Sequence, residues 1–176
     1  MMQKEPAVLF PEEMIQECVR ELGRRISADY SDVEELVLIG VLRGCYIFLA
    51  DLSRCLKIPR RIDFIAISSY EHTTTPGTLR LIMDTRTDIT GKHVLIIEDI
   101  VDTGQTLHYL LDMLSARKPA SLKTCALLRK PDRLEKDVHI DYLGFDIPDL
   151  WVVGYGLDYA DRFRALPYIG FVEEEC

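Results

Sequence analysis

The stretch of sequence that decides the fold is Val94-Leu95-Ile96-Ile97-Glu98-Asp99-Ile100-Val101-Asp102-Thr103-Gly104-Gln105-Thr106. Its first four residues are apolar and mostly β-branched, which favours a buried strand. Glu98 and Asp99 follow where we expect that strand to end. The run from Asp102 to Thr106 then turns into residues 107–114, whose apolar side chains recur at helical spacing. Backbone N–H groups and the positive end of a helix dipole meet at such a turn, which predicts a phosphate site beside two acids.

Strands and helices alternate on both sides of this stretch. Apolar runs predict strands at 36–41, 62–67, 79–83, 122–128, 142–145 and 151–153. Helical spacing predicts helices from Pro11 and over 46–56, with a first apolar face of Met14, Ile15, Val19, Leu22 and Ile26. This alternation indicates an α/β fold with a mostly parallel twisted sheet flanked by helices. We expect one domain over 1–176, with a small hood built mainly from 129–176 and the N-terminal segment over the ligand-binding edge.

Composition excludes several classes of protein. The 176 residues carry a net charge of −8, which argues against bulk binding to nucleic acid or to an anionic membrane. No apolar stretch reaches the roughly 18 residues of a membrane span, and the N-terminus lacks the apolar core of a signal peptide. The five cysteines show no C-x-x-C spacing, so neither a zinc site nor a disulfide framework is indicated and we expect a cytoplasmic protein. They are Cys18, Cys45, Cys55, Cys125 and Cys176.

The central stretch allows more than one chemistry. Glu98 and Asp99 are either solvated acids at a strand end or a grip for ribose hydroxyls, a divalent metal, or both. The phosphate turn has no Walker A lysine, which excludes an ordinary P-loop nucleoside triphosphatase. Its Asp-Thr-Gly triplet also occurs in aspartic proteases, but those proteins are β-rich, whereas this triplet leads from a strand into a helix.

Residues 94–106 as a whole closely resemble the phosphoribosyl-pyrophosphate signature of type I phosphoribosyltransferases. Leu42-Arg43-Gly44 resembles the pyrophosphate loop of that family, and Ser69 and Tyr70, within a long polar loop, match its flexible lid. Residues 128–130 and 151–159 resemble the base-binding segments of the hypoxanthine-guanine branch, in its bacterial type. The similarity extends from about Leu36 to Val172.

The resemblance implies a purine-salvage reaction. Ribose 5-phosphate moves from phosphoribosyl pyrophosphate to hypoxanthine or guanine, and IMP or GMP and pyrophosphate result. Backbone amides of Asp102, Thr103, Gly104, Gln105 and Thr106, with the two threonine hydroxyls, would hold the 5′-phosphate. Glu98 and Asp99 would hold the ribose hydroxyls, and Asp102 would be the base that manages the proton on purine N7.

The resemblance also implies how the leaving group and the base are bound. Mg²⁺ is the expected cofactor, with Glu98, Asp99 and Asp158 in its site. Arg164 and the amides of Arg43 and Gly44 would contact pyrophosphate. In this family the peptide before the residue at position 43 is often cis, and that residue is lysine in many relatives.

For the base, Lys130 would donate to the 6-oxo group, and the backbone of Val152 and Asp158 would read the opposite purine edge. Trp151 either packs in the core or stacks on the purine. The expected assembly is a homodimer or homotetramer. A xanthine-preferring transferase and an RNA-binding regulator of the same fold are the alternatives, and the regulator would need a basic face.

Overall fold

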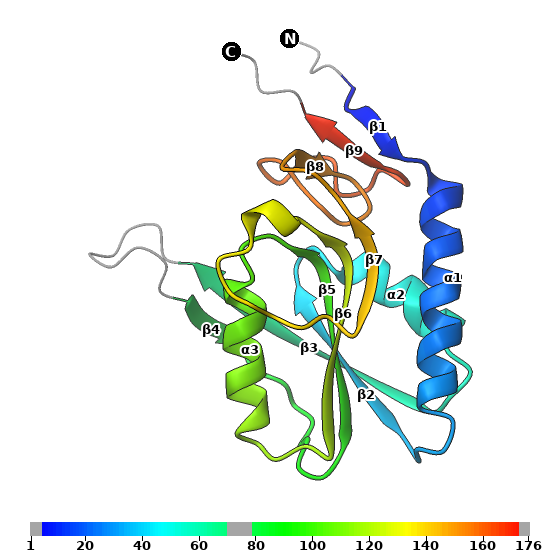
Figure 1. Ribbon diagram of the computed structural model, residues 1–176, viewed down its shortest axis with the longest axis vertical. Helices are drawn as coiled ribbons and strands as arrows, with labels where there is room; N and C mark the ends of the chain where they lie inside the picture. Colours follow the sequence, from blue (N-terminus) through cyan, green and yellow to red (C-terminus); the bar gives the residue numbers. More distant parts are fainter. Residues whose placement is uncertain (1–4, 70–78, 173–176) are drawn as a thin grey trace.

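A parallel sheet forms the centre of the molecule (Figure 1). The structure is a computed structural model that describes residues 5–69 and 79–172. Within these ranges the large sheet has six strands in the order β4-β3-β2-β5-β6-β7. All neighbours pair in parallel except the edge strand β4, which is antiparallel to β3. The bounds are β2 Leu36–Leu42, β3 Arg60–Ser69, β4 Leu79–Met83, β5 His93–Val101, β6 Ser121–Arg129 and β7 Tyr142–Asp146.

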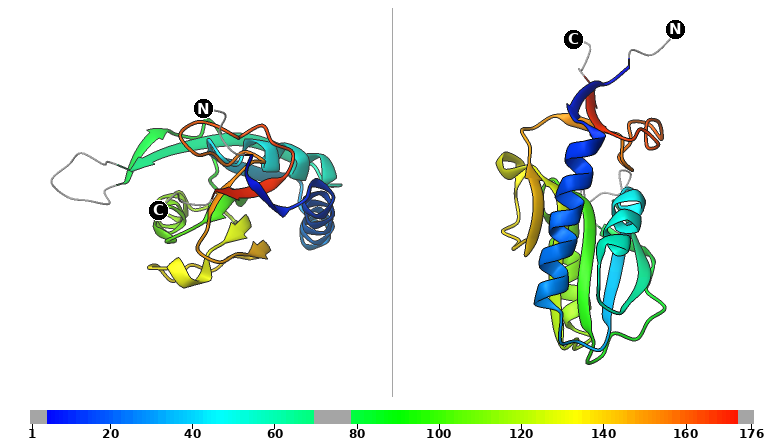
Figure 2. Two further views of the ribbon diagram at one scale, coloured as in Figure 1. Left: turned by 90° about the horizontal axis from the view of Figure 1, so that it is seen from above. Right: turned by 90° about the vertical axis from the view of Figure 1, so that its right-hand side faces the viewer.

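Helices cover both faces of this sheet, as the alternating pattern predicts (Figures 1 and 2). α1 (Glu12–Asp29) and α2 (Tyr46–Cys55) pack on one face, and α3 (Gln105–Ser115) packs on the other. Ile15, Val19, Leu22 and Ile26 are buried at intervals of three and four residues. Met14 was expected in the core but is 48% exposed, because it lies about 100° around the helix from Ile15.

A second, smaller sheet forms the hood. It consists of β1 (Ala7–Phe10), β9 (Ile169–Val172) and β8 (Trp151–Val153), all antiparallel, in the order β1-β9-β8. The hood therefore joins both ends of the described chain, above the carboxyl edge of the large sheet (Figure 1). β7 lies within the predicted hood range but extends the large sheet instead, because it pairs with β6.

The central strand β5 runs further than expected. It continues to Val101, because Ile100 and Val101 still pair with Leu128 and Arg129 of β6. Glu98 and Asp99 therefore lie inside the strand, where successive side chains point to opposite faces. No helix in the described ranges is long and apolar enough to cross a membrane.

Candidate active site

A cavity of about 1070 Å³ lies between the carboxyl edge of the large sheet and the hood. It gathers most of the side chains that the sequence singles out, from strands, loops and hood alike. Its lining includes Arg43, Gly44, Asp99, Asp102, Lys130, Trp151, Val152, Asp158 and Arg164. A smaller pocket of about 90 Å³ is lined by Glu98, Asp102, Thr103, Gly104 and Thr106. Asp102 is the predicted site residue that lines both.

The two adjacent acids of β5 face different pockets. Glu98 lines the small pocket and is only 5% exposed, whereas Asp99 lines the large cavity. Burial, reinforced by the charge of Asp99, raises the pKa of Glu98 well above its ordinary value. Burial also raises the pKa of Asp99 to about 6, and the nearby Asp158 carboxylate adds to that shift. The described residues contain no cluster of three metal-ligating side chains, so the predicted set of Glu98, Asp99 and Asp158 is not assembled as one group.

Two glycines allow the loops around Asp99 to approach closely. A Cβ atom on Gly44 would lie 1.7 Å from Oδ2 of Asp99. Gly156, at φ +104°, comes so near that a Cβ there would lie 2.0 Å from the Gly44 carbonyl oxygen. The peptide between Leu42 and Arg43 is cis, as the family resemblance implies. Asp99 is therefore held directly against the backbone of the predicted pyrophosphate loop.

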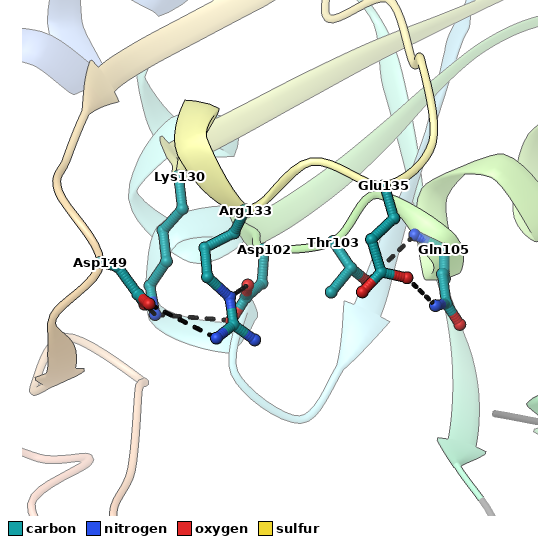
Figure 3. Close-up of polar contacts among 7 residues, drawn as sticks. All are labelled: Asp102, Thr103, Gln105, Lys130, Arg133, Glu135 and Asp149. Atoms are coloured by element: carbon teal, nitrogen blue, oxygen red, sulfur yellow. Dashed lines mark hydrogen bonds and ion pairs between the residues drawn. The ribbon is translucent and has the colours of Figure 1, made fainter. Parts of the chain in front are cut away.

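The predicted phosphate loop lies at the start of α3. Gly104 has φ +79°, a conformation that glycine adopts without steric cost, and it caps the helix. The Thr103 carbonyl accepts hydrogen bonds from the amides of Glu135 (3.0 Å) and Lys136 (3.1 Å). The Gln105 side chain donates to Glu135 at 2.6 Å and lines neither pocket, so it braces the loop from outside (Figure 3).

Four charged side chains, all of which line the cavity, form a ring of ion pairs (Figure 3). Nζ of Lys130 lies 3.1 Å from Oδ1 of Asp149 and 3.4 Å from Oδ2 of Asp102. Arg133 completes the ring, with Nε 2.9 Å from Oδ1 of Asp102 and Nη1 3.4 Å from Oδ2 of Asp149. The Lys130 side chain is only 8% exposed. Hydrogen bonding to Lys130 lowers the pKa of the Asp149 carboxyl below its ordinary value.

A second group of ion pairs lies around Asp161. Arg164 contacts Oδ1 of Asp158 at 2.6 Å and Oδ1 of Asp161 at 3.3 Å, and it donates to the Gly156 carbonyl at 2.8 Å. Arg43 contacts the same Asp161 oxygen at 2.9 Å. Both arginines predicted at the pyrophosphate end are thus paired with carboxylates in this structure.

Trp151 is 53% exposed, lines the cavity and meets Tyr159 edge to face at 5.5 Å, so its alternative role in the core is excluded. Ser69 ends β3 beside the cavity-lining Ser68, and Tyr70 lies outside the described residues.

Sequence reasoning missed Asp149 and Asp161, and for Arg133 it allowed either a place beside Lys130 as support or a role as an exposed charge. The only local signal for Asp149 is its place between Pro148 and Trp151.

Comparison with known proteins identifies the same family. The model of the phosphoribosyl transferase domain matches residues 12–160. The hypoxanthine-guanine phosphoribosyltransferase of Dictyostelium discoideum is 49% identical, over 96% of each chain. A hypoxanthine-guanine phosphoribosyltransferase structure from Bacillus anthracis, with HEPES in the active site, is 46% identical, covers 97% of this chain and all of its own, and has a TM-score of 0.91. The Trypanosoma cruzi hypoxanthine phosphoribosyltransferase bound to its product IMP is 44% identical, covers 99% and 98%, and has a TM-score of 0.90.

Proposed function

We propose, because this chain belongs to the family of phosphoribosyl transferases, that it moves 5-phosphoribosyl from phosphoribosyl pyrophosphate to hypoxanthine or guanine. The products are IMP or GMP and pyrophosphate, so the reaction is one of purine salvage. The observation that carries the proposal is the shared cavity. Lys130 and Trp151, which suit a 6-oxopurine, line the same 1070 Å³ space as Asp99, Asp158 and Arg164, which suit a sugar pyrophosphate.

The sugar phosphate is assigned to the β5–α3 connection. The 5′-phosphate occupies the small pocket, where the start of α3 and the hydroxyls of Thr103 and Thr106 supply donors. Glu98 borders this pocket and Asp99 borders the main cavity, so the two acids approach the ribose hydroxyls from the two sides of β5. The backbone at Gly44 and the Arg164 side chain line the space left for pyrophosphate.

The residues fit a magnesium ion that arrives with the substrate. Mg²⁺ is usually bound by one or two carboxylates together with substrate phosphates and water, so it needs no three-carboxylate cage. Asp99 and Asp158 line one cavity, and the charge of Asp158 makes ionisation of Asp99 harder, a repulsion that a cation relieves. These two residues would hold the ion, and Glu98 is assigned to the sugar. When bound, the ion neutralises charge that develops on the departing pyrophosphate.

The base is selected at its 6-position. Nζ of Lys130 can only donate, so it matches a 6-oxo group and leaves the 6-amino group of adenine without a partner. Trp151 lies exposed in the cavity, available to stack on the ring, and Val152 follows it in β8. The backbone of Val152 and Asp158 reads the opposite edge of the purine.

We assign to Asp102 the role of the base that accepts the proton on purine N7. Arg133 and Lys130 each contact one of its oxygens, which fixes the carboxylate at the cavity wall. As the bond to the sugar forms at N9, the ring loses electron density and the N7 proton becomes more acidic. A carboxylate within hydrogen-bond reach then accepts it, a contribution typically worth about 10²–10⁴-fold in rate.

A panel of bases tests the proposal. Initial rates are measured with hypoxanthine, guanine, xanthine and adenine, each with phosphoribosyl pyrophosphate and Mg²⁺. We expect turnover of hypoxanthine or guanine, weak or no turnover of adenine, and no rate after chelation of the metal. Absence of turnover with every 6-oxopurine would sink the proposal.

Two further assignments accompany this function. All four cysteines in the described part of the chain are free thiols, which suits the reducing cytoplasm. A homodimer or homotetramer is the expected assembly, and sedimentation velocity would measure it.

A further inference from the structure

We propose that Asp149 is a positioning residue of the purine site, which shares the Lys130 ammonium with Asp102 and thereby keeps it in place for the 6-oxo group. This inference rests on the proposed function, because it assumes a 6-oxopurine in the cavity. The Asp149 carboxylate contacts Lys130, and the proposed function gives it no role in binding the 5′-phosphate or pyrophosphate.

The position of Lys130 is set by two competing acids. Its backbone is fixed just beyond the end of β6, because its amide donates to the carbonyl of Val101, the last residue of β5, at 3.0 Å. Its ammonium lies between Oδ1 of Asp149 at 3.1 Å and Oδ2 of Asp102 at 3.4 Å. The side chain is nearly excluded from solvent, so little water competes with these two carboxylates. Removal of either acid must therefore shift the ammonium toward the other.

Asp149 is mounted on a short, braced connection between β7 and β8. The Ile147 amide donates to the Arg129 carbonyl at 2.8 Å, and the Leu150 amide donates to the Pro148 carbonyl at 2.8 Å. Pro148 restricts the backbone further. Trp151 follows two residues later, so one rigid segment carries both the carboxylate that holds Lys130 and the ring that stacks on the base. The spacing between the 6-oxo donor and the stacking residue is thereby fixed.

Loss of Asp149 would affect both halves of the reaction. The ammonium, which already contacts Asp102 at 3.4 Å, would move fully onto that carboxylate, and the 6-oxo group would lose its donor. The closer pair would also compete with the N7 proton for Oδ2 of Asp102, the oxygen that Arg133 does not contact. Arg133 could not restore the distance between the Lys130 ammonium and Asp102, because it contacts the other oxygen, Oδ1.

The test is Asp149→Asn, with binding of two nucleotides as the readout. IMP carries the 6-oxo group, and purine riboside 5′-monophosphate carries hydrogen at that position. A charge-assisted hydrogen bond corresponds to roughly 10–100-fold in affinity, so we expect the preference for IMP to fall by about tenfold or more. Affinity for the 6-hydrogen nucleotide should stay within about twofold, and the KM for phosphoribosyl pyrophosphate should not change.

Asp146→Asn is the matched control. Asp146 is three residues earlier and pairs with Arg129 at 2.6 and 2.9 Å, outside the cavity. It should leave the IMP preference unchanged. In a Lys130→Gln background, Asp149→Asn should have no further effect on that preference.

Equal losses for both nucleotides, no loss for either, or an undiminished effect without Lys130 would each overturn the inference. Failure of the proposed function would look different, because the wild-type enzyme itself would then turn over no 6-oxopurine.

Discussion

Asp102 differs from its acidic neighbours in being held by two cations, one on each carboxylate oxygen. Asp102→Asn keeps the shape and the hydrogen-bonding oxygen but cannot take up a proton. We expect kcat to fall by about 10²–10⁴-fold with little change in the affinity for phosphoribosyl pyrophosphate. Steady-state kinetics and calorimetric titration measure the two effects. Asp132→Asn, an exposed acid beside the ring, is the control, and unchanged turnover of the Asp102 variant would remove it from the mechanism.

A single residue, Asp99, makes the free energy of unfolding depend on pH. Its pKa is about 6 in the folded chain against about 3.9 when unfolded, so the folded state binds more protons between these values. Stability contributed by the protonated carboxyl is therefore lost as pH rises from about 4 through 6. Without metal, Asp99→Asn should be more stable than wild type at pH 7.5, by on the order of 1–3 kcal/mol, and the difference should vanish near pH 4.

Urea unfolding at several pH values measures this difference. Asp84→Asn is the control with opposite sign, because hydrogen bonding from Arg117 lowers the pKa of Asp84. That variant should lose stability at neutral pH and recover it in acid. A constant difference for Asp99→Asn at every pH would contradict the prediction.

At the scale of elements, the start of α3 depends on one glycine and one covering loop. Gly104 has φ +79°, and a Cβ there would lie 2.9 Å from the Lys136 carbonyl oxygen. The covering segment 135–136 is itself bound to the Thr103 carbonyl, so it cannot withdraw without breaking two hydrogen bonds. The phosphate loop and its cover therefore form one unit.

Gly104→Ala should destabilise that unit through backbone strain and also through a clash between the new Cβ and the covering segment. We expect a loss of about 2 kcal/mol or more in stability, together with weaker binding of phosphoribosyl pyrophosphate. Gly91→Ala is the matched control, since Gly91 has φ +69° but nothing lies within 4 Å of its Cβ position. It should cost about 1–2 kcal/mol and leave binding unchanged. Thermal unfolding and calorimetry compare the two, and equal effects would rule out a role for the cover.

At the scale of the whole molecule, the base site depends on the chain's first strand. β1 pairs with β9, which pairs with β8, the strand of Trp151. Tyr155, in the loop after β8, is also fixed to α2, because its hydroxyl donates to Asp51 at 2.6 Å. Residues from opposite ends of the sequence therefore hold the purine side of the cavity, whereas β2, β5 and α3 hold the sugar side.

Deletion of residues 1–9 should weaken the purine side of the cavity more than the sugar side. We expect the KM for hypoxanthine to rise by about tenfold or more as β9 and β8 lose their partner strand, with a smaller change for phosphoribosyl pyrophosphate. Deletion of residues 1–4 keeps β1 and is the control. Steady-state kinetics with each substrate varied gives the comparison, and equal changes in both KM values would refute the division of labour.

Local sequence determined the parts of this protein whose cause is local. β-branched runs produced the parallel strands, helical spacing produced α1 to α3, and the order of residues 94–106 identified the phosphate turn and the family. Apolar runs predicted strands at six places outside this stretch, and each is present, with no end shifted by more than two residues. These features follow from backbone preferences and from the burial of apolar side chains, which neighbouring residues decide.

Tertiary structure alone decided which charges meet. Asp149 and Lys130 are 19 residues apart in the chain, and Lys130 and Asp102 are 28 apart, yet they form one ring. β1 and β9 are four-residue strands that the sequence analysis did not predict, and each completes hydrogen bonds of the other. Glu98 and Asp99 are sequence neighbours that the pleat of β5 turns to different pockets. Contacts between distant segments depend on how the layers pack, which no short pattern encodes.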